Sequence, residues 1–385
     1  MARHAPELEA GQRIRRPVER RAIERFLDCG DLHRGFARIR CERCGHDYLL
    51  AFSCKFRGLC PSCHQKRMLA HADWLEDEVL APVPHRQYVF TVPRALRGHF
   101  RRDRRLLGEL CRLCARLLGR FYRSADRRGR PGFVLYVQTF GDLVTFNPHI
   151  HALVADGVFL PDGTFRVLPA LPEAALTEAL RRAVLALLVR RGVIDADFAT
   201  RLLGWRHSGF SVHNQVRIRA GDAEGRRHLA RYMNRAPLAL EKMRYQAESG
   251  MVIYRSRMHA RLERNFQLMP GARWLELLLT HVPDRGEHLV RYYGHYSSRS
   301  RGERAKAARE QQDTETAPSP ALLHEQPEMQ RARASWARLI ARVYQVDPLV
   351  CPRCAGPTRA IALIEESTVV RRILEHLGEW SPREV

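Results

Sequence analysis

The stretch Asn147-Pro148-His149-Ile150-His151 places two histidines on either side of one bulky apolar residue. In a β-strand, alternate side chains point to the same face of the sheet. His149 and His151 would therefore project together, while Ile150 packs on the opposite face. Two adjacent imidazoles supply half of a divalent-metal site. Triplets of this kind also arise by chance, so the interpretation depends on the rest of the chain.

Composition predicts a globular protein with a polyanionic partner. The chain has 385 residues, of which 45% are hydrophobic and 28% are charged, enough for roughly two or three domains with cores of their own. Lys and Arg number 65 against 42 Asp and Glu, and the net charge of +23 favours nucleic acid as the partner. A GC-rich genome would explain the preference for Arg over Lys, but not the excess of basic over acidic residues.

The cellular setting can be inferred from what the sequence contains. No apolar run approaches the ~18 residues that cross a bilayer, and the N-terminal residues lack the apolar core of a secretory signal. We therefore expect a cytoplasmic protein with no membrane partner. In a reducing compartment, its ten cysteines are better explained as metal ligands or core thiols than as disulfides.

Hydrophobic periodicity predicts both helices and strands along the chain. The strand candidates are 86–92, 133–140, 149–155 and 211–218, and the helix candidates are 13–30, 64–80, 95–123, 173–191 and 223–243. Residues 297–322 are rich in Ser, Arg, Glu, Ala and Pro, which predicts a flexible linker. The expected organisation is an N-terminal helix with a cysteine-rich domain (1–82), a central domain (83–296), the linker (297–322) and a C-terminal helical unit (323–385).

The cysteine-rich segment predicts a structural zinc site. Cys41 and Cys44 form one Cys-x-x-Cys pair, and Cys60 and Cys63 form a second pair 15 residues later. Two such turns complete a tetrahedron of thiolates around Zn²⁺, which would add folding energy to a short polar segment. Cys54 lies between the pairs and could replace one of the four ligands. Further candidates nearby are His33, His46 and His64 as ligands, and Lys55 and Arg57 as contacts to DNA phosphates.

Two other cysteine pairs have less certain roles. Cys111 and Cys114 lie on an apolar helical face, which indicates core thiols. Cys351 and Cys354 have the Cys-x-x-Cys spacing of a zinc knuckle, but no second pair follows them. They form either half of a site that an unidentified ligand completes, or no metal site at all.

Several motifs resemble those of a known family, both in their residues and in their order. They are Cys41-x-x-Cys44-Gly45, Ser53-Cys54-Lys55, Arg57, Cys60-Pro61-x-Cys63, Gln138-Thr139-Phe140-Gly141, Gly209-Phe210-Ser211-Val212-His213, Leu229-Ala230-Arg231-Tyr232, Arg291-Tyr292-Tyr293-Gly294 and Asp347-Pro348-Leu349-x-Cys351-Pro352-x-Cys354. Together with the opening stretch, they resemble the rolling-circle transposases of the insertion sequence ninety-one family. The resemblance spans about residues 25–375.

The resemblance implies both a fold and a reaction. The fold would be α+β: an antiparallel-sheet HUH endonuclease core of the ferredoxin or RNA-recognition-motif kind, an N-terminal zinc-binding domain and a helical C-terminal extension. The reaction would nick and rejoin single-stranded DNA at element ends and at the target through a 5′-phosphotyrosine intermediate. Residues 83–296 would be the catalytic domain.

The resemblance also implies a catalytic metal site. His149 and His151 would hold Mg²⁺ or Mn²⁺, which would polarise and orient the scissile phosphate. Gln138, on the preceding strand, is the candidate for the third ligand. Asp142 and Asp156 are rivals, although each lies beside a glycine, where a turn is expected.

Tyr232 is the candidate nucleophile. It lies on a predicted helix in a cationic setting that includes Arg226, Arg227, Arg231 and Arg235, and of these Arg231 and Arg235 are our candidates for binding DNA. Two-tyrosine members of the family carry Tyr-x-x-x-Tyr here, whereas this chain has His228 at the first position, so it resembles the single-tyrosine branch. Tyr292 and Tyr296 have the same spacing, but Gly294 interrupts them. With one tyrosine, cleaving donor and target would need sequential reuse or a second protomer in a homodimer.

Two alternatives remain open from the sequence. The first is a plasmid or phage rolling-circle replication initiator, which uses the same chemistry in another role. The second is a non-catalytic zinc DNA-binding regulator. No Gly-x-x-x-x-Gly-Lys phosphate loop occurs, so strand separation would depend on host replication factors.

Overall fold

The computed structural model describes residues 1–259, 263–313 and 349–380. It confirms an α+β protein with antiparallel sheets. The chain divides into two compact units. Unit 1 comprises Met1–Ala70, Leu238–Val282 and the described part of Ala321–Val385, and unit 2 comprises His71–Pro237 and the described part of Pro283–Pro320.

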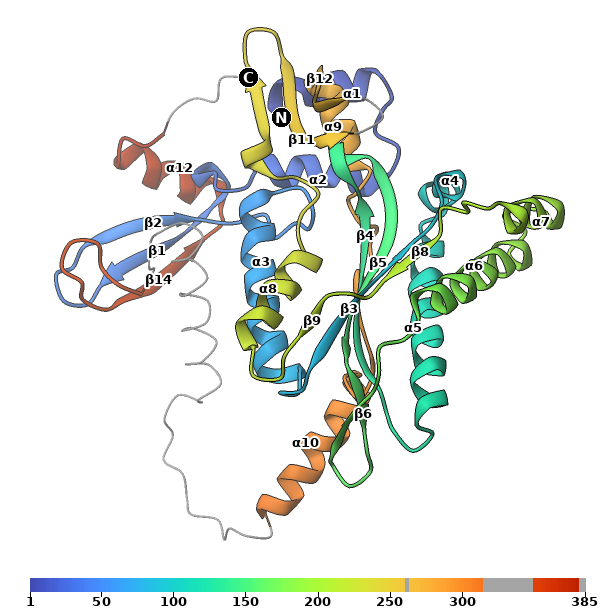
Figure 1. The fold of residues 1–385 in the computed structure, drawn as a ribbon. Helices are drawn as coiled ribbons and strands as arrows, with labels where there is room; N and C mark the ends of the chain where they lie inside the picture. Colours follow the sequence, from blue (N-terminus) through green and yellow to red (C-terminus); the bar gives the residue numbers. More distant parts are fainter. Residues whose placement is uncertain (260–262, 314–348, 381–385) are drawn as a thin grey trace. The chain divides into compact units, whose positions relative to one another are not determined.

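Unit 2 is built on a six-stranded antiparallel sheet (Figure 1). The strand order is β13 (Val290–Gly294), β4 (Gly132–Phe140), β5 (Phe146–Ala155), β3 (His85–Thr91) and β8 (Ser211–His213), and β9 (Arg217–Ile218) also pairs with β3. A two-stranded ribbon follows β5 and consists of β6 (Gly157–Phe159) and β7 (Phe165–Val167). The predicted strands 86–92, 133–140 and 149–155 are therefore the three central strands of this sheet.

Helices cover both faces of the unit 2 sheet. One face packs on a core formed with α4 (Arg94–Arg102), α5 (Arg105–Ala125), α6 (Glu173–Arg190) and α7 (Ala196–Gly204). Ile150 of β5 lies in this core, as do Cys111 and Cys114 of α5, which confirms them as core thiols. The other face packs against α8 (Ala223–Met233) and the helical segment η3 (Leu75–Val79). The alternation of β5 thus turns His149 and His151 toward the second face.

Unit 1 contains two small three-stranded antiparallel sheets. The first has the order β14 (Thr358–Ile364), β1 (Phe36–Cys41) and β2 (Asp47–Ala51). The second consists of β10 (Met243–Gln246), β11 (Met251–His259) and β12 (Arg264–Pro270). The helices of unit 1 are α1 (Ala5–Ala10), α2 (Pro17–Leu27), the first part of α3 (Pro61–Trp74), α9 (Gly271–Leu279) and α12 (Ser367–His376). The remaining short helical turns of the chain are η1 (Ala2–His4), η2 (Leu32–Arg34), η4 (Asp142–Val144) and η5 (Leu240–Lys242).

The predicted domain limits differ from these units in four places. Residues 71–82 belong to unit 2 rather than to the N-terminal domain. Residues 238–282 belong to unit 1, whereas most of the predicted central domain belongs to unit 2. The C-terminal segment is not a separate helical unit, because β14 pairs with β1 along its whole length, from Phe36 opposite Ile364 to Cys41 opposite Thr358. Within the predicted linker, Ser298–Asp313 form helix α10, and residues 314–322 lie outside the described residues.

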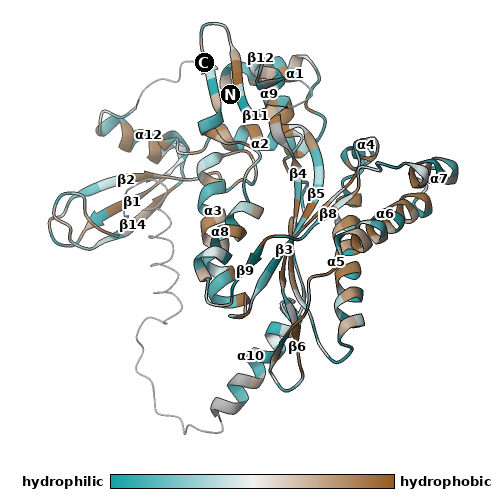
Figure 2. Cartoon of the chain, viewed as in Figure 1, coloured by the Kyte–Doolittle hydropathy of each residue, from teal (hydrophilic) through white to brown (hydrophobic). Residues whose placement is uncertain are grey.

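The composition of α10 explains why it is helical. Its residues are mostly hydrophilic (Figure 2), yet Arg, Glu, Ala, Lys and Gln are strong helix formers. Two ion pairs with i,i+4 spacing, Arg299–Glu303 and Lys306–Glu310, add to this intrinsic preference. A low content of large apolar residues was therefore a poor criterion for a flexible linker.

Candidate active site and cysteine clusters

The two histidines of the opening stretch lie side by side on β5. Both are buried, with 8% and 3% of their surface exposed, and their ring centroids are 4.8 Å apart. The Nε2 atoms of His149 and His151 are separated by 3.0 Å. Two donors that bind one cation at ~2.1 Å along perpendicular directions would lie about 3 Å apart. The geometry of the pair therefore suits two ligands of one ion.

Hydrogen bonds fix the orientation of both rings. His149 Nδ1 donates to the backbone carbonyl of Asn147 at 2.7 Å, and because a carbonyl only accepts, the lone pair of this ring is on Nε2. His151 Nδ1 lies 3.0 Å from the side-chain amide of Gln87 on β3. Burial lowers the pKa of both rings, that of His151 to about 3, with a further contribution from Arg235. Both imidazoles are therefore neutral at pH 7 and able to act as ligands.

Gln138 lies directly opposite His149 in the β4–β5 pairing, so the two side chains share one face of the sheet. Its Nε2 donates to the backbone carbonyls of Tyr232, at 3.3 Å, and Met233, at 2.6 Å. Two carbonyl acceptors require the amide nitrogen at this position, which settles the orientation of the amide. Gln138 Oε1 is buried without a hydrogen-bond partner, and such an orphaned oxygen fits a ligand.

Tyr232 lies at the last turn of α8, next to the histidine pair. Its ring centroid is 5.7 Å from that of His151, with the two rings nearly perpendicular at 84°. Tyr232 as a residue remains 41% exposed. The guanidinium of Arg235 lies 4.6 Å from the centroid of Tyr232 and 5.5 Å from that of Phe140. The structure thus brings together the predicted nucleophile, the histidine pair, Gln138 and Arg235.

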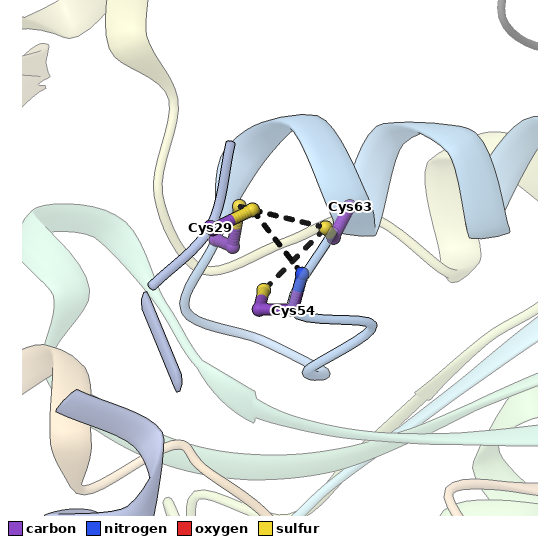
Figure 3. A group of neighbouring side chains, drawn as sticks. Cys29, Cys54 and Cys63 are labelled. Atoms are coloured by element: carbon purple, nitrogen blue, oxygen red, sulfur yellow. Dashed lines mark hydrogen bonds between the residues drawn. The ribbon is translucent and has the colours of Figure 1, made fainter. Parts of the chain in front are cut away.

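The cysteines form two clusters, and their pairing corrects the predicted zinc site. In the first cluster, Cys60 and Cys63 at the start of α3 meet Cys54 and Cys29. The sulfur atom of Cys29 lies 3.6 Å from that of Cys60. It also lies 3.6 Å from the sulfur of Cys63, which is 3.4 Å from the sulfur of Cys54, and Figure 3 shows these three side chains turned toward one another. The backbone N–H of Cys54 also donates to the sulfur of Cys29. Four thiolates around one Zn²⁺ would be about 3.8 Å apart, so this cluster fits a structural zinc.

Cys41 and Cys44 do not join Cys60 and Cys63. They lie beside Cys351 and Cys354 instead, and these four sulfur atoms form the second cluster. The predicted single site of Cys41, Cys44, Cys60 and Cys63 is therefore wrong in its grouping, although each pair belongs to a tetrad. None of His33, His46 and His64 is a member of either cluster. His33 instead contacts Asp31, 2.8 Å away, and packs on the ring of Trp380.

Cys29 was missed because it stands alone, 25 residues before Cys54, and has no Cys-x-x-Cys partner. Near this first cluster, Lys55 is exposed and Arg57 is half-buried. Lys55 has a φ of +52°, an uncommon conformation for a residue other than glycine.

Comparisons with known proteins identify the family. A model of the insertion sequence ninety-one type, described as a transposase zinc-binding domain, matches residues 1–92, and a second, described as a putative transposase, matches residues 132–304. The chain belongs to the insertion sequence ninety-one family of transposases.

Two curated relatives agree with this assignment. The transposase for insertion sequence element IS801 of Pseudomonas savastanoi pv. phaseolicola is 24% identical over 372 residues, which cover 92% of this chain and 86% of the relative. The putative transposase y4qJ of Sinorhizobium fredii is 28% identical over 295 residues, 70% of this chain and 72% of the relative. No solved structure matches the chain.

The cationic setting expected around Tyr232 in this transposase is largely neutralised. Acidic residues of α3 and η3 pair with three of the four arginines that were predicted to surround Tyr232. The pairs are Arg226 with Glu76 at 2.6 Å, Arg227 with Asp77 at 2.8 Å, and Arg231 with Asp73 at 3.6 Å and with Glu224 at 2.9 Å. Arg235 makes cation–π contacts and has no ion pair among the described residues. Of the two arginines predicted to bind DNA, Arg235 is therefore the better placed.

The alternative site residues have structural roles in the transposase. Asp156 is buried and ion-paired with Arg86 and Arg217, so it supports the sheet and does not compete with Gln138. The side chain of Asp142 lies outside the described residues. Tyr296 is fully buried, and its hydroxyl lies 2.9 Å from His85 Nε2. The burial of Tyr296 argues against Tyr292 and Tyr296 as a nucleophile pair, which stays a prediction.

In the described parts of the chain, every helix is too short or too polar to cross a bilayer.

Proposed function

We propose that this transposase cuts and rejoins single-stranded DNA through Tyr232, at the ends of its element and at the target. The observation that carries the proposal is the contact between the Tyr232 ring and His151, which joins a half-exposed phenol to a buried histidine pair. A nucleophile must be reachable by DNA, whereas metal ligands are best held by the sheet. The exposure of Tyr232 beside two histidines held by β5 supports the proposal.

The reaction conserves the number of phosphodiester bonds. The Tyr232 oxygen would attack the scissile phosphorus and lose its proton, and the bond from phosphorus to the 3′-oxygen would break. The products are a 5′-phosphotyrosine and a 3′-hydroxyl, which takes up a proton. A 3′-hydroxyl later attacks the same phosphorus and releases Tyr232, so rejoining needs no external energy source.

His149, His151 and Gln138 have the donor set for a divalent cation. Two neutral imidazole nitrogens and one orphaned amide oxygen suit Mg²⁺ or Mn²⁺. When bound, the cation would supply charge stabilisation at the scissile phosphate. The Gln138 amide also holds the backbone at Tyr232 and Met233, so it would position the nucleophile relative to the ligands.

Arg235 would bind the DNA phosphate beside Tyr232. Its guanidinium lies over the tyrosine ring and carries a charge that the described residues leave uncompensated. The phosphate contact should make binding weaken as salt increases. The sequence signature favours the single-tyrosine branch, so two cleavages would require sequential reuse of Tyr232 or a homodimer, with host factors separating the strands in the cytoplasm.

The experiment is a covalent-adduct assay with a labelled oligonucleotide that carries the single-stranded element end, in Mn²⁺ or Mg²⁺. Wild-type protein should form an adduct that survives denaturing electrophoresis. Tyr232→Phe and His149→Ala should each abolish the adduct. An adduct that persists in Tyr232→Phe would show that another residue is the nucleophile.

Two matched controls separate chemistry from folding. Tyr245→Phe removes a hydroxyl from a tyrosine of the same 41% exposure in unit 1, and His228→Ala removes an exposed histidine from α8. Both variants should keep the adduct at the wild-type level. If wild-type protein forms none on its own element's ends, the non-catalytic regulator is favoured instead.

A further inference from the structure

The second cysteine cluster is made by two turns with the same backbone geometry. In the first turn, the N–H of Cys41 donates to His46 O at 2.9 Å, and the N–H of Gly45 donates back to Cys41 O at 3.1 Å. In the second, the N–H of Cys351 donates to Gly356 O at 2.8 Å, and the N–H of Ala355 donates to Cys351 O at 2.9 Å. The two Cys-x-x-Cys turns therefore have the same two backbone hydrogen bonds at equivalent positions.

The residue after the second cysteine has the same conformation in both turns. Gly45 has a φ of +70°, and Ala355 has a φ of +54° although it is not glycine. A left-handed alanine is strained by ~1 kcal/mol or more, and such a conformation persists when the surrounding structure requires it. The four thiols of the two turns lie within 4.8 Å of one another, so the turns face each other.

The distances between sulfur atoms fit a metal better than disulfides. Cys41 and Cys354 are 3.5 Å apart, Cys44 and Cys351 are 3.6 Å apart, and all four sulfur atoms lie within 4.8 Å of one another. A disulfide would need about 2.05 Å, whereas thiolates around one Zn²⁺ would be about 3.8 Å apart. Four thiols that converge on one point are also the donor set that selects zinc.

The two turns come from opposite ends of the chain, 313 positions apart between Cys41 and Cys354. Strand pairing brings them together, since β1 leads into Cys41 where it lies opposite Thr358 at the start of β14. Helix α12, which follows β14, packs Val370 and Leu374 on Phe36 of β1. Among the described residues, three buried side chains form the core of this contact and five partly buried apolar side chains pack against them, which is a small core for holding a segment by hydrophobic burial alone.

We propose that Cys41, Cys44, Cys351 and Cys354 bind a second structural zinc ion, which fastens the C-terminal segment 349–380 to strand β1. The family model for the zinc-binding domain ends at residue 92, so it does not include the two C-terminal ligands. The zinc-binding part of this transposase is therefore discontinuous, and the C-terminal segment belongs to it. The proposal does not depend on the reaction assigned to Tyr232.

The first test is the zinc content of reduced, full-length protein, measured by elemental analysis. Wild type should contain two zinc ions per chain, one for each tetrad. Cys351→Ser/Cys354→Ser should contain one, and Cys54→Ser/Cys63→Ser should also contain one. A matched control, Cys111→Ala/Cys114→Ala, changes two buried thiols outside the clusters and should retain two. A wild-type content of one zinc, or disulfides found by thiol counting, would overturn the proposal.

The second test asks whether the zinc holds the segment in place. A protease site inserted within residues 314–348 allows the full chain to be folded first and cut afterwards. The released C-terminal fragment should co-elute with the rest of the protein in size-exclusion chromatography, and should separate after zinc is chelated. The same cut in Cys351→Ser/Cys354→Ser should release the fragment without a chelator. A fragment that stays bound in the Ser variant would show that zinc is not the fastening.

Discussion

Gln87 should control the affinity of the metal site proposed at His149 and His151. Its amide nitrogen lies 3.0 Å from His151 Nδ1, and the residue is 7% exposed, so water offers little substitute for this contact. In the structure the amide donates to Nδ1, which places the ring proton on Nε2, directed at His149. A metal ion needs the Nε2 lone pair. For metal to bind, the ring proton must therefore move to Nδ1 and the amide must turn so that its oxygen accepts.

The size of the effect follows from this role. A partner that fixes the tautomer of a metal-bound histidine typically contributes 10–100-fold in metal affinity, about 1.4–2.7 kcal/mol. Gln87→Leu removes the acceptor while keeping an apolar side chain of similar length. Gln87→Glu leaves an acceptor that cannot donate, so it favours the metal-binding tautomer without any rotation. We expect ~10–100-fold weaker Mn²⁺ binding in Gln87→Leu and unchanged or tighter binding in Gln87→Glu.

The assay is an electron paramagnetic resonance titration of free Mn²⁺ in the presence of full-length protein, which needs no DNA and no turnover. Gln215→Leu is the control, because Gln215 is exposed and contacts Glu173 outside the site. It should bind Mn²⁺ as wild type does. Affinity of Gln87→Leu within twofold of wild type would refute the reasoning about the tautomer.

Three further predictions concern the stability of unit 2. Burial lowers the pKa of His85 from 6.5 to about 3, so the folded state excludes a proton that the unfolded chain takes up below pH 6.5, and stability falls as the pH is lowered from about 6.5 toward 3. In urea unfolding, this group should lower the free energy of unfolding by ~2 kcal/mol at pH 5 relative to pH 7. Between these two pH values, His85→Gln should therefore lose ~2 kcal/mol less stability than wild type. Equal losses in both proteins would contradict the role given to His85. Arg226→Met should leave Glu76 buried and unpaired and cost ~3–5 kcal/mol, most of which the double variant with Glu76→Leu should restore, as a double-mutant cycle by urea unfolding would measure. Gly294 has a φ of +61°, and a Cβ there would lie 1.8 Å from Pro131 O, so Gly294→Ala should lower the thermal midpoint strongly. The control is Gly286→Ala, at a φ of +79° with no atom within 4 Å, which should lower the free energy of unfolding by only about 1 kcal/mol. Equal effects of the two substitutions would show that the close approach to Pro131 O is unimportant.

The features predicted correctly from the sequence are those encoded by neighbouring residues. The period-two pattern around His149 and His151 was sufficient to place both on one face of a strand, and β5 forms there. Gln138 could be placed near them because β4 and β5 are consecutive strands joined by a short turn, which makes cross-strand neighbours of residues close in sequence. The role of each as a ligand stays a prediction.

The features that could not be predicted depend on distant partners. The arginines of α8 looked like a phosphate-binding surface, but Asp73, Glu76 and Asp77, about 150 residues earlier, neutralise three of them. Local charge does not reveal such pairs, because they form only when α8 packs on η3. For the same reason, spacing alone joined Cys41 and Cys44 to the nearest Cys-x-x-Cys turn along the chain.

The number of cysteines indicates two metal sites, which the Cys-x-x-Cys spacing alone does not reveal. The chain has ten cysteines, and setting aside the core pair Cys111 and Cys114 leaves eight, which is two sets of four. A single site of four would have left Cys29, Cys54, Cys351 and Cys354 without a role. If each of these eight cysteines is required to belong to a site of four, the sequence predicts two tetrads. It does not predict which cysteines share a tetrad, because the count does not specify which turns meet in the fold.

The ligand types divide the metals proposed for this transposase into two classes that can be tested separately. The eight clustered cysteines offer soft thiolates, which select Zn²⁺ over Mg²⁺ and Mn²⁺. The proposed site on β5 offers two imidazoles and an amide oxygen rather than thiols, so it would bind Mn²⁺ under conditions in which both tetrads would retain zinc. Loss of adduct formation on removal of Mg²⁺ or Mn²⁺ alone would therefore report on the histidine pair. Loss that requires removal of zinc would report on the folding of unit 1, because the tetrads belong to that unit.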